Sequence, residues 1–163
     1  ILGLNLSCEK DDICAEATAT TPHLIIRFYN VNAPDDTKQV RRLSVIGEGL
    51  EEGNEIIFNT TTDSIVLPLR FQDEDITTTT RFELKKDTDY DTDSNATTVS
   101  NTDIIEISYT PKFVYVSRAC GYKSVFENAQ ITVEPDTENW IFSYEIINST
   151  IENEKAAHIN IYH

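Results

Sequence analysis

The sequence predicts an all-β protein, a β-sandwich that is immunoglobulin-like or similar and has about eight short antiparallel strands. Apolar and polar residues alternate in several short runs, which is the period of a half-buried strand. Turn-forming residues separate these runs about every ten residues. β-branched and aromatic residues are plentiful, and no stretch has the apolar period of an amphipathic helix. A small β-barrel is the alternative, because it requires the same alternation.

The first half of the domain contains five predicted strands, separated by turn-rich loops that include residues 30–38 and 48–54. Pro68 lacks an N–H, which indicates an edge strand at that point. The strands are expected at residues 23–29, 40–47, 55–59, 64–70 and 76–85. The side chains expected to face the core are Leu24, Ile26, Phe28, Leu43, Val45, Ile65, Leu67 and Leu69.

The second half begins with a long polar loop at residues 87–101. Residues 104–109 and 112–118 are expected to form a hairpin that turns at Thr110-Pro111. Residues 120–130 are the one stretch that could hold a helical turn. A further alternating run covers residues 140–147. The last predicted strand ends at His163 and turns Ala157, Ile159 and Ile161 inward.

Residues 1–7 are mostly apolar and end on Ser7, immediately before Cys8. This segment is too short to span a bilayer and is typical of the end of a secretory signal. A cysteine directly after it resembles the processing site of bacterial lipoproteins, whose cysteine becomes the acylated first residue. We therefore expect residues 1–7 to be the remnant of a lipoprotein signal peptide and Cys8 to be lipidated. The alternative is a disordered or strand-forming start with Cys8 as an ordinary disulfide partner.

Residues 8–21 are expected to be a lipid-anchored tether, followed by a single β domain at residues 22–163. The charged run Lys10-Asp11-Asp12 resembles the surface-export signal of Bacteroidota lipoproteins. A solvated charged linker is the alternative interpretation. The expected location is the outer membrane, with the domain either in the periplasm or exposed on the cell surface.

The cysteine count agrees with a lipid anchor. The chain has three cysteines, and an odd number in an exported protein leaves one without a partner. If Cys8 carries lipid, Cys14 and Cys120 can pair. Their bridge would close a loop of about 107 residues, which loop-closure entropy rates at roughly 4–5 kcal/mol. Two buried free thiols are the alternative, typical of a cytosolic protein.

The charge of the chain argues against nucleic acid as a partner. Asp and Glu total 28 and Lys and Arg total 13, a net charge of −15, and such a chain repels phosphates. The longest segment without an acidic residue lies between Glu106 and Glu127. It contains Lys112, Arg118 and Lys123, with Tyr115, Tyr122 and Phe126 between them. We expect a patch of Lys112, Arg118, Lys123 and Tyr122 that faces the membrane or a partner. The alternative is that these aromatic residues belong to the core.

No motif in the sequence indicates a catalytic, metal or cofactor site, and we expect none. The aspartates at 87, 89, 91 and 93 lack the glycine and the glutamate of a calcium-binding loop. His23, His158 and His163 lack the spacing of zinc ligands. No nucleophile elbow or phosphate-binding glycine loop is present.

Several segments resemble an uncharacterised family of Bacteroidota lipoproteins, a domain of unknown function. The resemblance is carried by Cys14, residues 24–29, residues 116–123, residues 126–128 and residues 156–163. It covers nearly the whole chain and implies a location and a bacterial group, but no activity.

The resulting expectation is a non-enzymatic envelope lipoprotein. Its β-sandwich would be held close to the outer membrane and would dock an unknown envelope protein or structural component. The alternative is a secreted glycan-binding module or a carboxylate-based hydrolase with an acidic cleft.

Overall fold

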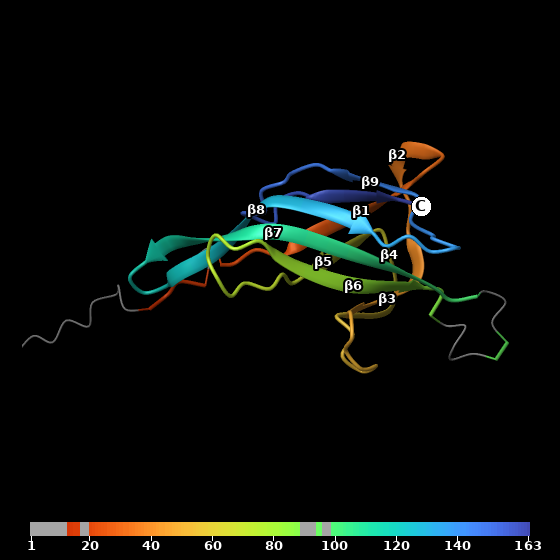
Figure 1. Ribbon diagram of the computed structural model, residues 1–163, viewed down its shortest axis with the longest axis horizontal. Coiled ribbons are helices and arrows are strands. Elements are labelled where there is room, and N and C mark those ends of the chain that lie inside the picture. The colour runs from red at the N-terminus through yellow and green to blue at the C-terminus, as the bar shows by residue number, and fades with distance from the viewer. Residues whose placement is uncertain (1–12, 17–19, 89–93, 96–98) are drawn as a thin grey trace, which may run out of the picture.

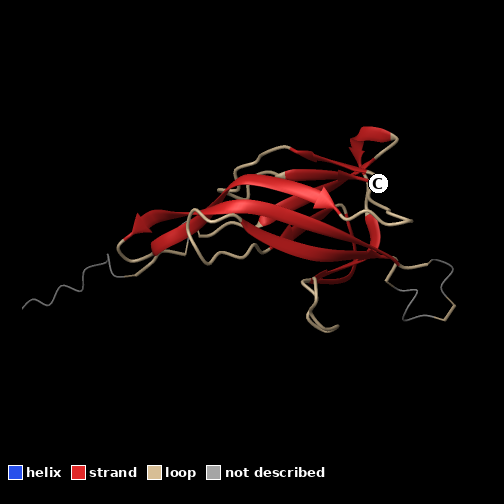
Figure 2. Ribbon diagram, in the orientation of Figure 1, coloured by secondary structure: helices blue, strands red, loops and turns tan. Residues whose placement is uncertain are grey.

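The computed structural model describes residues 13–16, 20–88, 94–95 and 99–163. Within them the protein is all-β: ten strands form two five-stranded sheets, and no helix is present (Figure 2). The sheets are not closed into a barrel, so the β-sandwich prediction is confirmed. No helix in the described part of the chain is long and apolar enough to cross a membrane.

The first sheet is built around β1, the first strand of the domain (Figure 1). Its strands are β1 (Leu24–Asn30), β2 (Ala33–Thr37), β5 (Ser64–Leu67), β9 (Ser143–Ile146) and β10 (Ile159–Tyr162). On one side β1 pairs with β2 and β5, and on the other with β10. The β1–β10 pairing is parallel, with Ile26 opposite Ile159. The expectation of antiparallel strands was therefore wrong for this pair, because an alternating pattern does not encode strand direction.

The second sheet is antiparallel throughout, in the order β4-β3-β6-β7-β8. Its strands are β3 (Val40–Gly47), β4 (Ile57–Thr62), β6 (Thr78–Lys86), β7 (Asn101–Ser117) and β8 (Gly121–Val133). β7 and β8 have 17 and 13 residues and are the longest strands. Their hairpin runs along most of the long axis of the molecule (Figure 1).

The core lies between the two sheets and contains the side chains that the alternation selected. Those fully or nearly fully buried include Leu24, Ile26, Phe28, Leu43, Val45, Ile65, Leu67, Leu69, Ile159 and Ile161. Among the strands that the structure describes, β5 pairs with β1 alone, and Pro68 follows its last residue. The edge position inferred from Pro68 is therefore confirmed.

The predicted turn at Thr110-Pro111 is absent, and β7 passes straight through it. Strand β6 begins opposite Tyr109, so Pro111 lies just beyond the end of the ladder that β6 forms with β7. The carbonyl of Pro111 accepts a hydrogen bond from the N–H of Asp75, 3.0 Å away, on that side. In a strand, the N–H and the carbonyl of one residue point the same way. The N–H that Pro111 lacks would therefore also have pointed away from β8. A proline at this position therefore costs the pairing with β8 nothing.

The possible helical turn at residues 120–130 is wrong, because β8 occupies this segment. Ser124, Val125 and Phe126 are consecutive buried residues, so the alternation of buried and exposed residues that identifies a strand is interrupted here. A bulge then shifts the register between Thr110↔Glu127 and Ser108↔Gln130. Asn128 supplies it with a φ of 55°, a conformation that asparagine tolerates better than most residues.

Two other predictions need smaller corrections. The loop predicted at residues 30–38 contains β2, which returns against β1. The run at residues 140–147 yields only the four residues of β9. Trp140 and Ile141 are both buried, whereas Phe142 is 67% exposed. The segment bends there because the buried carboxylate of Asp103 accepts the N–H of Ile141 at 2.8 Å.

Candidate functional site

The end of the β7–β8 hairpin, residues 112–123, extends beyond the sandwich and is called the hairpin tip here. Past Tyr109, β7 loses its partner β6 and pairs with β8 alone. The face of the hairpin that covers the core continues along this extension, where no strand of the other sheet, as far as the structure describes the chain, lies opposite. Phe113, Tyr115 and Tyr122 lie on that face and are 39%, 58% and 70% exposed. Tyr115 and Tyr122 face each other across the strands, with ring centroids 5.5 Å apart.

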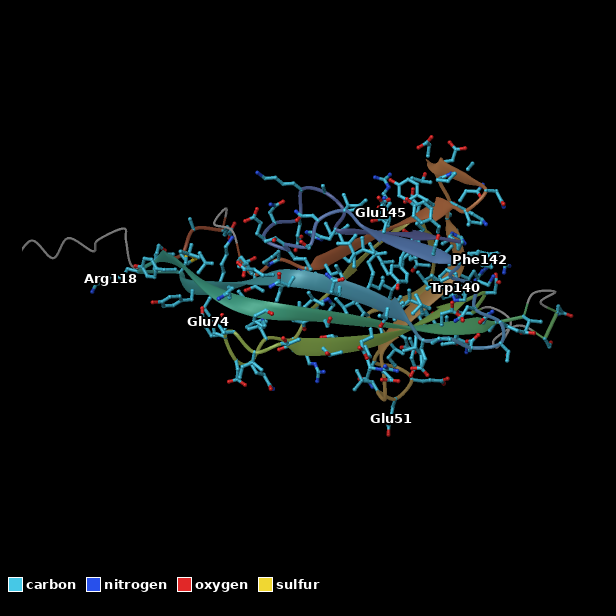
Figure 3. The ribbon with its side chains drawn as sticks, turned by 45° about the horizontal axis from the view of Figure 1, so that its top comes forward. Glu51, Glu74, Arg118, Trp140, Phe142 and Glu145 are labelled. Atoms are coloured by element: carbon cyan, nitrogen blue, oxygen red, sulfur yellow. A yellow bond between two sulfur atoms is a disulfide. The ribbon has the colours of Figure 1, made fainter. Side chains whose placement is uncertain are left out.

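The structure separates the four residues of the predicted patch. Arg118 and Tyr122 are exposed on the hairpin tip, and Figure 3 shows Arg118 at its far end. Lys112 lies at the base, in an ion pair with Asp75 that raises the pKa of the lysine. The ammonium of Lys123 lies 3.5 Å from the carbonyl oxygen of Glu152. The acid-free segment therefore meets carboxylates of another loop at its base.

Glu74 belongs to the same loop as Asp75. Its carboxylate accepts the backbone N–H of Phe113 at 3.0 Å, and Figure 3 shows it beside the hairpin. The loop therefore occupies the edge of β7 that β6 leaves free. The sequence of the hairpin alone could not reveal these contacts, because the acidic residues belong to a loop about forty positions earlier in the chain. Phe126, the third aromatic residue of the segment, is fully buried in the core.

A disulfide connects the segment that precedes the domain to the hairpin tip. Cys14 is bonded to Cys120, with Cα atoms 4.7 Å apart and a sequence separation of 106. This is the pair expected from the sequence. The hydroxyl of Thr21 also accepts the N–H of Ser124 at 2.9 Å. A hollow of about 250 Å³ lies between the N-terminal segment and the hairpin, lined by Cys14, Cys120, Tyr122 and Lys123 among others. Cys8 and residues 1–7 lie outside the described residues.

An apolar groove of about 600 Å³ opens at the side of the sandwich where β5 faces β3 and β6. Leu50, Ile56, Leu69 and Phe82 are among its lining residues. Arg70 spans the opening and donates a hydrogen bond to the carbonyl of Thr79 at 2.7 Å. The groove is thus an opening between the sheets that one side chain bridges.

The opposite side of the sandwich is closed by backbone hydrogen bonds. Phe126 of β8 and Ile151 exchange two of them, at 3.0 and 2.7 Å. The hydroxyl of the buried Tyr109 adds a link between the sheets, since it is 2.6 Å from the Thr80 hydroxyl and donates to the Arg70 carbonyl at 2.7 Å. Burial raises the pKa of Tyr109, so this hydroxyl keeps its proton.

A second hollow, of about 310 Å³, has an acidic lining. It includes Glu52, Glu55 and Glu83, with the 60% exposed side chain of Phe58 at its wall. Both carboxylate oxygens of Glu55 accept the N–H of Gly53, at 3.1 and 3.0 Å. Its composition matches the acidic cleft of the alternative function.

Arg81 binds three other carboxylates in or next to this sheet. It forms ion pairs with Glu48, Glu106 and Glu134. The hydrogen bond from Arg81 lowers the pKa of Glu48. Four different segments meet at this guanidinium, so its role in the fold is to neutralise neighbouring acids.

Each histidine takes part in contacts that support the fold. The ring of His23 lies 2.6 Å from the carboxylate of Glu154. His158 is buried, and its Nδ1 accepts the N–H of Ile25 at 3.0 Å, which holds β1 against the segment before β10. His163 is also buried, with Nε2 3.1 Å from the carbonyl of Lys38. Burial lowers the pKa of both His158 and His163.

Comparison with known proteins gives a family and no activity. None of the curated proteins and none of the solved structures compared with the chain matches it. One family profile matches residues 42–163, which is most of the chain and includes most of β3 and all of β4 to β10. The chain therefore belongs to DUF6452, a family of unknown function.

Proposed function

We propose that this protein is a non-enzymatic envelope lipoprotein of a Bacteroidota bacterium, anchored in the outer membrane through an acylated Cys8. The domain at residues 22–163 would stand close to that membrane, on its periplasmic or its outer side. There it would dock an unknown envelope protein or structural component. No ligand or cofactor is invoked for this role.

The observation that supports the proposal best is the bond between Cys14 and Cys120. A disulfide of this kind is typical of proteins exported to an oxidising compartment. It also leaves Cys8 as the single cysteine outside the bridge. The six residues from Cys8 to Cys14 reach at most about 20 Å when fully extended. An anchor at Cys8 would thus hold the hairpin tip within about that distance of the bilayer.

We expect Cys8 to be acylated when the full chain is expressed with its own signal sequence. Cells would be grown with an alkyne fatty acid, and the labelled protein would be detected after fractionation. The Cys8→Ala variant should lose both the label and the membrane association. Cys14→Ala is the matched control, because it removes a neighbouring cysteine and should still be labelled. A Cys8→Ala protein that is labelled and sediments with membranes would refute the anchor.

The acidic hollow supports a second candidate, a glycan-binding module or a carboxylate-based hydrolase. Phe58 offers an exposed ring for stacking, and Glu83 is one of three carboxylates in the lining. On a glycan array, binding that is lost in Phe58→Ala but kept in Phe142→Ala would support the module. Release of reducing ends that is lost in Glu83→Gln would support the hydrolase. A protein inactive in both assays would exclude this candidate.

A further inference from the structure

We propose that the hairpin tip inserts its aromatic side chains into the phospholipid headgroup layer of the membrane that anchors the chain. This inference rests on the proposed lipid anchor and adds a direct contact between the folded domain and lipid. The contacting residues are Phe113, Tyr115 and Tyr122 on one face, with Arg118 at the end of the hairpin.

The exposure of the three rings is the first argument. They lie on the face of the hairpin that buries Ile105, Ile107 and Tyr109 further along β7, so they continue a core-facing row into solvent. Tyr115 and Tyr122 form an edge-on pair, and no described strand of the other sheet covers their apolar rings. Tyrosine rings suit a membrane interface, because the ring is apolar and the hydroxyl can hydrogen-bond to water or headgroups.

Charge is the second argument. The chain has a net charge of −15, yet the hairpin from residue 107 to residue 126 contains no acidic residue. The two acidic side chains that contact this hairpin from the 74–75 loop lie at its base, on Lys112 and on the N–H of Phe113. Beyond them the tip carries Arg118. A guanidinium binds a phosphate, and every glycerophospholipid headgroup offers one.

Position is the third argument, and it selects lipid over other occupants. The chain that leads to Cys8 leaves the described structure at Ile13, which is 81% exposed and adjacent to the disulfide at the tip. A tether of about 20 Å therefore ends beside the hairpin, which has exposed rings and no acidic residue of its own between residues 107 and 126. The opposite end of the long axis holds β2 and the C-terminus (Figure 1). A tether that is anchored at Cys8 necessarily brings the lipid surface close to the tip.

The test uses the full-length Cys8→Ala chain, which lacks acyl groups, so any binding to lipid comes from the protein itself. Partitioning would be measured by co-sedimentation with phosphatidylcholine vesicles and with vesicles containing phosphatidylglycerol, at millimolar lipid. We expect measurable binding to both. Replacing Phe113, Tyr115 and Tyr122 by serine should weaken partitioning at least about tenfold. Replacing Arg118 by alanine should weaken it about fivefold.

The matched control replaces Phe58, Phe142 and Tyr144 by serine, which are 60%, 67% and 41% exposed and lie away from the tip. It should bind like the parent chain, and circular dichroism should show that both triple variants are folded. Equal binding by the tip and control variants, or no binding by the parent to either vesicle, would overturn the proposal. So would a dimer that dissociates only in the tip variant, because a second copy would then cover the rings. If Cys8 of the wild type is not acylated, the proposed anchor fails, whereas vesicle binding still reports on the tip alone.

Discussion

His158 shows how a single buried side chain connects distant parts of the chain. Its Nδ1 accepts the N–H of Ile25, and its Nε2 lies 2.9 Å from the carbonyl of Asn153. The ring must be neutral to accept and donate at the same time. Burial, the largest influence, lowers its pKa from the ordinary 6.5, while the contact with Asn153 and the charge of Glu154 act in the opposite direction. His163 is shifted in the same direction, also by burial.

We expect the unfolding free energy to fall as the pH drops below about 6.5. In that range the unfolded chain binds protons that the folded histidines do not, so acid favours the unfolded state. The slope should be at most about 1.4 kcal/mol per pH unit for each histidine. Urea titrations at several pH values would measure it. In His158→Gln the slope should be shallower, whatever the absolute stability of that variant. An unchanged slope would show that His158 titrates normally in the folded protein.

At the scale of elements, the β7–β8 hairpin shows what the sequence can and cannot predict. The core positions of β7 follow from strict alternation of residues such as Ile105 and Ile107. Pro111 suggested a turn because its missing N–H normally ends a ladder, and nothing in the sequence shows that β6 has already ended there. β8 was harder still, since the bulge at Asn128 breaks its period. The exposure of Tyr122 agrees with the patch expected from the sequence. Its cause could not be predicted, because it depends on where the opposing sheet stops.

The disulfide fixes this hairpin to the segment that precedes the domain. We expect the double variant Cys14→Ser, Cys120→Ser to lose about 2–5 kcal/mol of unfolding free energy, because the bridge restricts the unfolded chain over a separation of 106 residues. Urea titrations of the oxidised and the reduced wild type should differ by the same amount. Mass mapping without reductant should first show the Cys14–Cys120 peptide. Alkylation of both Cys14 and Cys120 in protein isolated without reductant would contradict the bridge.

At the scale of the whole molecule, the sequence predicted the fold class better than its connectivity. Alternation shows which side chains meet in a core but not which strands are neighbours, so no edge could be assigned except the one that Pro68 indicates. The separation of Lys112 from Arg118 is of the same kind, because the acids that hold Lys112 come from another part of the chain. That the hairpin tip extends beyond the sandwich follows only from comparing the lengths of the two sheets in the structure.

The parallel pairing of β1 with β10 has a consequence for how the protein folds during its synthesis. These two strands are separated by most of the domain, so this pairing has to wait until residues 159–162 have left the ribosome or the export channel. Until then, β1 has one open edge and an apolar face made of Leu24, Ile26 and Phe28. Pairings over such distances fold slowly, and unpaired apolar strands aggregate. The emerging chain therefore passes through an interval, lasting until residues 159–162 are available, in which its apolar first strand is prone to aggregate.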